Sequence, residues 1–427
     1  MYSHEHFCGK VVLIEVGVTR ELSWHLLPKL VLKGAVFTAS EFIEQGVVVV
    51  DDSSGIIEDV GRQGEVDEPR EGTRIIADKG TTILPGLVDA HVHFFGTPGP
   101  NIIDWVTVPE TLAALRSVRD LRRLLLAGFT TVRDLGSKVG TYLSQAVREG
   151  IVEGPRVISA SRPLARTGGD DDPTMLPLPI AEELSYSYHC DGPWECRKAV
   201  RKVIRDGGET LKLYASGSLS QERKGHVQFT PEELKAIVDE AHLAGLKVAA
   251  HAWSEEGLMN VVEAGVDSIE HGMWLTPEIA DRIKKKGIFY VPTLSVFSAT
   301  KSTKANAYRE KFIRRHFAED MEIAKQSNLK IVAGSDYFGA DIVPHGQNYM
   351  EIVSLAKYLG NAEAIVAATS RAAECIGLNS KGQVKKGFDA DLIIVKGNPL
   401  TGLDAISPAR ISHVIKSGKI LTPNAQD

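Results

Sequence analysis

Two histidines separated by one residue, His91 and His93, are the side chains of this sequence best suited to carry chemistry. They directly follow the apolar run 82–90 (TILPGLVDA), which is typical of a buried strand. Residues at positions i and i+2 of a strand project from the same face, so both imidazoles would point into one enclosed space. Imidazole is a common ligand for zinc and similar metals. The spacing predicts a metal site, although paired histidines also occur in loops and cores.

Size and composition indicate a globular protein without a nucleic-acid or membrane partner. The 427 residues suffice for one large domain with a smaller one, or for two to three ordinary domains. The net charge is −6, and no long block of lysine or arginine suggests a phosphate-binding surface. No run approaches the ~18 apolar residues of a membrane span. The apolar start of the chain is a poor signal peptide, so we expect a cytoplasmic location.

The four cysteines do not suggest a disulfide framework in a chain of this length. Cys8 and Cys375 are far from any other cysteine in the sequence, whereas Cys190 and Cys196 are six positions apart. These two could pair with each other or bind a metal, but no second cysteine pair accompanies them. We therefore expect a reducing environment and leave the pair open.

Apolar, β-rich runs alternate with amphipathic helical segments from residue 83 onward. The clearest helix is 231–244, with Thr230 as N-cap, Pro231 at the first position and a buried stripe at helical spacing. Eight strand–helix units in about 300 residues fit a closed (β/α)8 barrel better than an open doubly wound sheet. The predicted strands are Ile83–Phe94, Phe129–Leu135, Arg156–Ala160, Leu211–Ala215, Leu246–Ala252, Val266–Glu270, Ile288–Leu294 and Leu329–Ser335.

The two flanks of this region have a different sequence pattern, with short β-like runs in place of alternating strands and helices. Short β-like runs occur at 30–37, 46–51 and 55–61, and again at 391–395 and 411–420. Short strands at both ends of a barrel-length middle predict one small β domain assembled from the two termini. We place this discontinuous domain at 29–84 and 378–427, around a barrel at 85–377. Residues 1–28 form an N-terminal extension with no clear pattern.

Chemistry-bearing side chains lie at the ends of the predicted barrel strands, where the active sites of such barrels are built. Lys212 lies between two leucines inside the fourth strand, and a buried charge there is costly unless it is paired or neutralised. Taken alone, one of these residues, such as His271, could be a hydrogen-bonded core histidine. The topology brings all six to one rim: His91, His93, Lys212, His251, His271 and Asp336.

Seven motifs distributed along the chain belong together: 85–93 (PGLVDAHVH), 211–217 (LKLYASG), 250–252 (AHA), 268–272 (SIEHG), 291–294 (VPTL), 334–336 (GSD) and 387–395 (GFDADLIIV). With these motifs the chain resembles the amidohydrolase superfamily from Leu30 to Ile420. It is similar to the imidazolonepropionase-like and Xaa-Pro dipeptidase-like subgroup, which includes carboxypeptidase-type amidases acting on N-acyl amino acids and ochratoxin-hydrolysing amidases. The last motif resembles the returning strand of that superfamily's β-sandwich domain, so the resemblance implies an α/β fold: a TIM barrel with a small β-sandwich.

The resemblance implies a site for two divalent metal ions. His91 and His93 would bind the more buried ion together with Asp336, and His251 and His271 would bind the second. Lys212 would bridge both ions as a carbamate formed with carbon dioxide, because two cations would repel an ammonium group but bind an anionic carbamate. An ordinary salt bridge from Lys212 to an aspartate is the alternative. Zinc is the expected metal, although cobalt, manganese and iron suit the same ligands.

Two further roles follow for residues at the same rim. Asp336 would act as base and acid, taking a proton from the attacking water and delivering it to the leaving amine. Tyr214, two residues beyond Lys212, faces the same way on an ideal strand and could donate a hydrogen bond to the developing oxyanion. An inward-facing packing role for Tyr214 is the alternative.

The resemblance implies a small-molecule amide substrate, with the scissile bond next to a free carboxylate as in a dipeptide or an N-acyl amino acid. Arg162 and Arg166, after the third strand, are candidates to bind that carboxylate, or are solvated loop arginines. His345, after the eighth strand, could line the pocket or have no role. The segment 167–172 reads TGGDDD where many subgroup members carry TGGH, so a basic or neutral substrate group becomes more plausible.

The leading interpretation is a binuclear metal amidohydrolase that resembles a carboxypeptidase or dipeptidase. A second interpretation keeps the site but changes the bond to a cyclic amide such as imidazolonepropionate, a lactone or a phosphotriester. A third is a non-catalytic scaffold on an amidohydrolase fold, although such a protein would be expected to lose ligands. Large barrels of this kind often associate, so we also expect a homo-oligomer.

Overall fold

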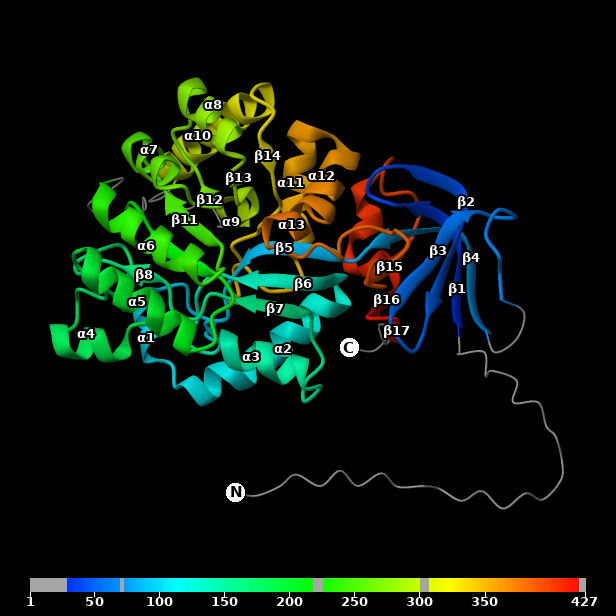
Figure 1. The fold of residues 1–427 in the computed structure, drawn as a ribbon, viewed down its shortest axis with the longest axis horizontal. Helices are drawn as coiled ribbons and strands as arrows, with labels where there is room; N and C mark the ends of the chain where they lie inside the picture. Colours follow the sequence, from blue (N-terminus) through cyan, green and yellow to red (C-terminus); the bar gives the residue numbers. More distant parts are fainter. Residues whose placement is uncertain (1–28, 70–72, 218–225, 300–306, 422–427) are drawn as a thin grey trace, which may run out of the picture.

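A computed structural model describes residues 29–69, 73–217, 226–299 and 307–421 (Figure 1). The predicted extension 1–28 lies outside these residues, as do the last positions of the predicted terminal domain, 422–427. Among the helices of the described residues, none has the length and apolar character needed to cross a membrane.

Parallel strands form the larger part of the fold. Within the described residues, each of the eight predicted runs overlaps a strand, and two short unpredicted strands, β8 and β9, pair beside β10. The strands make two sheets, ordered β5-β6-β7 and β14-β13-β12-β11-β10-β8-β9. Their bounds are β5 Leu87–Val92, β6 Phe129–Asp134, β7 Arg156–Ser159, β8 Leu164–Ala165, β9 Tyr188–His189, β10 Leu211–Tyr214, β11 Val248–Ala252, β12 Ser268–His271, β13 Phe289–Val291 and β14 Lys330–Ile331.

Backbone hydrogen bonds connect the two parallel sheets at two places. On one side, the amide of Ala90 in β5 donates to the carbonyl of Ala333, just after β14, at 3.0 Å. On the other side, the amide of Glu209, just before β10, donates to the carbonyl of Ser159 in β7 at 2.8 Å. The neighbouring strand ends therefore face a common region, and closure into a complete (β/α)8 barrel stays a prediction.

Helices surround the parallel strands in Figure 1. In α6 the predicted start is confirmed: the Thr230 side chain accepts from the amide of Glu233, which completes a capping box, and Pro231 holds the first position. The helices of the described residues are α1 Ile102–Thr107, α2 Glu110–Leu126, α3 Gly140–Arg148, α4 Leu178–Leu184, α5 Pro193–Arg205, α6 Pro231–Leu243, α7 Glu255–Ala264, α8 Pro277–Lys286, α9 Leu294–Ala299, α10 Ala307–Gln326, α11 Tyr349–Leu359, α12 Asn361–Ala367 and α13 Ser370–Cys375.

Strands from both flanks of the chain pair in one mixed sheet. Its order is β17-β16-β15-β4-β1-β2-β3, and Leu30, Val48, Ile83 and Ile394 lie in its apolar core. The sheet lies to one side of the parallel strands (Figure 1), and its form as a sandwich stays a prediction. The bounds are β1 Lys29–Phe37, β2 Phe42–Asp51, β3 Ile56–Arg62, β4 Thr73–Pro85, β15 Leu392–Lys396, β16 Ile411–Lys416 and β17 Lys419–Leu421.

The prediction of one continuous strand over Ile83–Phe94 is wrong, because the chain changes sheet at Gly86. The amide of Gly86 donates to the carbonyl of Asp391, whereas the amide of Leu87 donates to the carbonyl of Gly128. A Cβ atom at Gly86 would lie 2.2 Å from the Thr130 hydroxyl oxygen, so only glycine fits this close approach. The run therefore divides into the end of β4 and the whole of β5, which leads to the two histidines.

Candidate functional site

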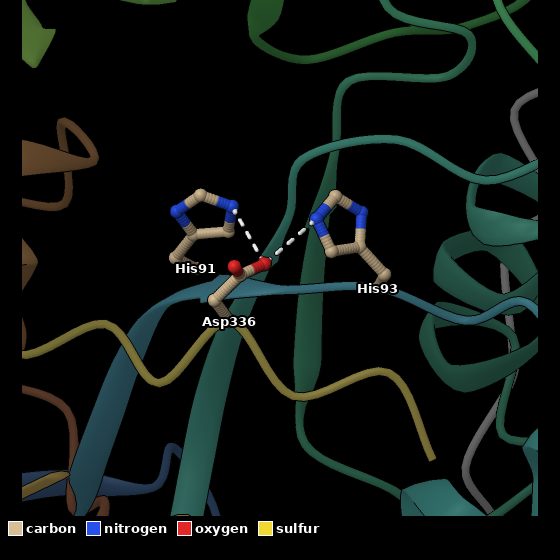
Figure 2. Close-up of side chains that lie close together, drawn as sticks. All are labelled: His91, His93 and Asp336. Carbon is tan, nitrogen blue, oxygen red and sulfur yellow. Dashed lines mark ion pairs between the residues drawn. The ribbon is translucent and has the colours of Figure 1, made fainter. Parts of the chain in front are cut away.

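His91, His93 and Asp336 form a compact group at the end of β5. The Nε2 atoms of the two histidines lie 3.3 and 3.2 Å from the Oδ1 atom of Asp336 (Figure 2). One ligand atom from each of the three residues lies within 4.8 Å of the others. Both histidines are buried, whereas the Asp336 side chain keeps 20% of its surface exposed. The prediction that the two imidazoles face one space is confirmed.

A left-handed backbone turn presents Asp336 to the histidines. The residue follows β14 and has a φ of +59°, a conformation that non-glycine residues adopt rarely. Its amide donates a 2.7 Å hydrogen bond to the carbonyl of His91, which ties the turn to β5. His271 at the end of β12 has a φ of +66°. Unusual backbone at two strand ends marks this rim as a constrained site.

The other three predicted ligands lie at the same rim. The ring centroids of His251, in β11, and His271 are 4.6 Å apart, and those of His91 and His271 are 5.4 Å apart. The Lys212 Nζ atom, from β10, lies 3.5 Å from the Nε2 atom of His91. The structure thus brings all six side chains together, although they span positions 91 to 336 of the sequence.

Hydrogen bonds orient the imidazole rings toward the centre of the group. The Nδ1 atoms of three rings are each engaged: that of His91 with Glu270 at 2.8 Å, that of His93 with the carbonyl of Gly136 at 2.9 Å, and that of His271 with the Thr293 hydroxyl at 2.7 Å. The buried Nε2 atom of His251 has no hydrogen-bond partner within the described residues. A buried nitrogen without a hydrogen-bond partner is costly, and a metal cation would satisfy it. The histidine nitrogens of this group therefore fit a bound metal cation.

Burial favours the neutral forms of three site histidines and, to a smaller extent, of Lys212. It lowers the pKa of His91, His251 and His271 well below the usual value, which leaves a lone pair for a metal on each ring. Burial also lowers the pKa of Lys212 to about 8. An ordinary salt bridge is the alternative role for Lys212. In the described part of the chain, no carboxylate forms an ion pair with its Nζ atom, although Glu270 and Asp336 are near enough to attract its charged form.

The sequence did not single out two charged residues that support the site, Glu270 and Arg133. Glu270, in β12, accepts hydrogen bonds from the His91 ring and from Arg133, whose guanidinium lies 2.8 Å from Oε1. Arg133, in β6, also donates to the carbonyl of Ala90 at 2.6 Å. Both side chains are buried. The available signal was a charge inside an apolar strand, the same feature that singled out Lys212.

Asp89 is a third supporting residue that the sequence reasoning missed. Its buried carboxylate accepts from the amide and the hydroxyl of Ser335 at 2.9 and 2.6 Å, and from the Asn348 side chain at 2.8 Å. It also accepts from the amide of His91. Asp89 therefore joins β5 to the segment that carries Asp336.

Tyr214 lies at the same rim but its hydroxyl already has a partner. The buried ring lies 5.4 Å from the Lys212 Nζ atom and 5.3 Å from the His251 ring. The hydroxyl forms a hydrogen bond with Asp171, a carboxylate that also accepts from Tyr186 and Ser187. Burial and then the nearby carboxylates raise the pKa of Tyr214 far above neutrality, so the phenol stays protonated.

The three predicted substrate contacts, Arg162, Arg166 and His345, differ in the hydrogen bonds and ion pairs that they form with other residues of the chain. Arg162 forms a 3.5 Å ion pair with Glu110. The buried Nε atom of Arg166 has no hydrogen-bond partner among the residues described. His345 is buried and its Nε2 donates to the carbonyl of His93 at 2.9 Å, so it supports a predicted ligand. Their roles toward a substrate stay predictions.

Comparisons with known proteins agree with the resemblance seen in the motifs. The sequence model of the Amidohydrolase family matches residues 82–421. The chain is 30% identical over 410 residues to an ochratoxinase of Aspergillus niger, covering 89% of this chain and 83% of that protein. A crystal structure of A. niger ochratoxinase has a TM-score of 0.85 at 26% identity and covers 93% of this chain and 96% of that one.

Two solved dipeptidase structures are similar as well. A prolidase complexed with N-methylphosphonate-L-proline has a TM-score of 0.83 at 29% identity, with 93% of this chain and 100% of that chain covered. A Xaa-Pro dipeptidase with bound methionine has a TM-score of 0.81 at 28% identity, with 92% and 100% covered.

Replacing Glu270 by glutamine should destabilise the folded protein, because the buried Arg133 would lose the one carboxylate with which it forms an ion pair among the described residues. We expect the free energy of unfolding of the metal-free protein to fall by about 3–5 kcal/mol. Urea unfolding followed by circular dichroism measures this change. The matched control is Glu263→Gln, which breaks an exposed pair with Arg282 and should cost less than about 1 kcal/mol. Equal losses in the two variants would contradict the role given to Glu270.

Proposed function

The chain belongs to the amidohydrolase family and is a hydrolase that acts on amide bonds, and we propose that it uses two divalent metal ions to cleave an amide bond next to a free carboxylate. Its substrate would be a dipeptide or an N-acyl amino acid, a class that includes ochratoxin-type amides. The observation that carries this proposal is the convergence of six side chains at the strand ends: His91, His93, Lys212, His251, His271 and Asp336.

The donor set divides between two cations. His91, His93 and Asp336 would hold one ion, since their ligand atoms already lie within 4.8 Å of one another. His251 and His271 would hold the second, and zinc is our first choice for both. When bound, these cations supply Lewis-acid chemistry, activating a water molecule and polarising the substrate carbonyl.

Lys212 would join the two ions as a carbamate. Its neutral amine attacks carbon dioxide, a nitrogen–carbon bond forms, and one proton is released to solvent. Because burial lowers the pKa of Lys212 to about 8, a larger fraction of the amine is neutral near pH 7 than in an exposed lysine. The product carries one negative charge shared by two oxygens, which suits a position between cations better than an ammonium group does.

Asp336 would carry the proton between water and the leaving amine. Burial alone would raise its pKa, but the neighbouring His91, His93 and Lys212 lower it below the ordinary value of 3.8. The carboxylate is therefore ionised near pH 7 and can accept a proton from the attacking water. Its partial exposure keeps it accessible from the substrate side.

Tyr214 would donate a hydrogen bond to the carbonyl oxygen as negative charge develops there. The raised pKa keeps its proton in place. The hydroxyl interacts with Asp171 in the structure, so it would turn away from that carboxylate when substrate binds. If it does not rotate, Tyr214 has the packing role that the sequence left open.

Arg166 is our choice to bind the substrate carboxylate, since its buried Nε atom has no partner within the described residues. Arg162 is the weaker candidate because it already pairs with Glu110.

The acidic segment 167–172 bears on the acyl group of the substrate. Asp171 and Asp172 are buried and accept hydrogen bonds from the chain, whereas Asp170 is partly exposed. A negative charge at that position disfavours an acidic acyl group and favours a neutral or basic one.

A substrate panel tests this assignment. We expect dipeptides and N-acyl amino acids with neutral or basic acyl groups to have kcat/KM values at least about tenfold above those of acidic analogues, a lactone and an aryl phosphotriester. Asp336→Asn is the control and should lower kcat by about 10²–10⁴-fold on every good substrate. A lactone or phosphotriester that outperforms all the acyl amino acids would assign the site to a different bond.

Replacing Lys212 by alanine should remove the bridging anion and with it most of the hydrolytic rate. A small carboxylate such as acetate or propionate can occupy the space left by the side chain, so we expect added carboxylate to restore part of the rate. Hydrolysis is measured with and without the added anion. The matched control is Lys247→Ala, which removes a lysine that pairs with Asp267 away from the rim. Full activity of Lys212→Ala without any added carboxylate would rule out the carbamate.

A further inference from the structure

Two buried cysteines lie side by side outside the hydrolytic site. Cys190 follows β9, and Cys196 lies in the first turn of α5. Their Sγ atoms are 2.9 Å apart, and the two residues keep only 2% and 0% of their surface exposed. This separation is well below the roughly 3.5–4.0 Å at which uncharged heavy atoms rest in contact. Both residues are free thiols in the structure, and their sulfur atoms already lie close enough for a small movement to bring them to bonding distance.

A metal ion is a poor explanation for this approach. Two thiolates on one tetrahedral zinc ion, each bound at about 2.3 Å, would be separated by roughly 3.8 Å. A structural zinc site also needs four ligands. In the part of the chain that the structure describes, the His91, His93 and Asp336 group is the only one in which three potential ligands gather, and it contains neither cysteine.

We propose that Cys190 and Cys196 form a disulfide bond, with glutathione disulfide as the oxidant. One cysteine thiolate attacks a sulfur of the oxidant and releases one reduced glutathione. The second cysteine then displaces the other glutathione from the mixed disulfide. The two cysteines lose two electrons and two protons, which the two glutathione molecules gain, and a sulfur–sulfur bond of about 2.05 Å results. This inference is independent of the proposed hydrolytic function.

The surroundings of the pair influence when the bond forms. The contact with Cys196 and then burial raise the pKa of Cys190, so the reactive thiolate is scarce in the folded protein. Oxidation is therefore expected to be fast in the folding chain and slow in the folded dithiol. Once formed, the bond is shielded from reductants by the same burial.

The bond would fix a segment that leads to the predicted substrate contacts. The amide of Cys190 donates to the carbonyl of Ala165, the residue before Arg166. The next residue, Asp191, accepts a hydrogen bond from the amide of Thr167 at 3.2 Å. A disulfide at this position ties the start of α5 to β8, β9 and the acidic segment 167–172. It also bears on the predicted reducing environment, because a stable bond here requires an oxidising step.

Mass spectrometry of the full-length protein tests the proposal directly. No lysine or arginine lies between Arg166 and Arg197, so trypsin releases one peptide, 167–197, that contains both cysteines. After expression in an oxidising host and alkylation in denaturant, we expect this peptide to be unalkylated and two hydrogen masses lighter than its reduced form. Cys8 and Cys375 should be alkylated. Alkylation of all four cysteines, both in that material and after incubation with glutathione disulfide, would overturn the proposal.

Thermal unfolding with and without reductant gives a second, independent readout. Reduction should lower the Tm of the wild-type protein by roughly 2–4 °C, because the unfolded chain regains the freedom that the cross-link removes. Cys196→Ala should show no such shift, whereas the matched control Cys375→Ala, which alters a buried cysteine in α13, should keep it. A shift of the same size in Cys196→Ala would also overturn the assignment.

Discussion

The carboxylate of Glu270 is the group on which the geometry of the site depends most. It lies between a guanidinium and an imidazole, with Arg133 on one side and the His91 Nδ1 atom on the other, both at 2.8 Å. An unpaired carboxylate or guanidinium would be costly in this buried position, so Glu270 and Arg133 hold each other in place. Because the three residues come from β12, β6 and β5, this one cluster sets the relative position of three strands. It also engages the Nδ1 atom of His91, which leaves the Nε2 atom on the side of Asp336.

A second carboxylate completes the frame around the candidate ligands. Asp89 gathers hydrogen bonds from Ser335, Asn348 and the amide of His91, so the turn that presents Asp336 cannot move independently of β5. The left-handed backbone of Asp336 and His271 has an energetic cost that such contacts offset. The fold thus holds His91, His93 and Asp336 in positions that could bind a metal ion, and divalent metals are generally used by this family.

Much of this arrangement is visible in the sequence, because strand positions follow from local apolar runs. Each predicted barrel strand overlaps a real one, and the end of a parallel strand is enough to place His251 or Asp336 at a common rim. The strand break at Gly86 was missed because it depends on the approach of Thr130 from another strand. Arg133 and Glu270 were missed for the same reason, since each looks like an isolated charge until its partner is known.

The central claim is that six side chains from the ends of five strands hold two cations at once. The most direct test is the metal content of the full-length protein after equilibration with zinc and bicarbonate and removal of free metal, measured by inductively coupled plasma mass spectrometry. The account predicts about two zinc ions per chain, as in two-metal hydrolytic sites. A content near zero would contradict it.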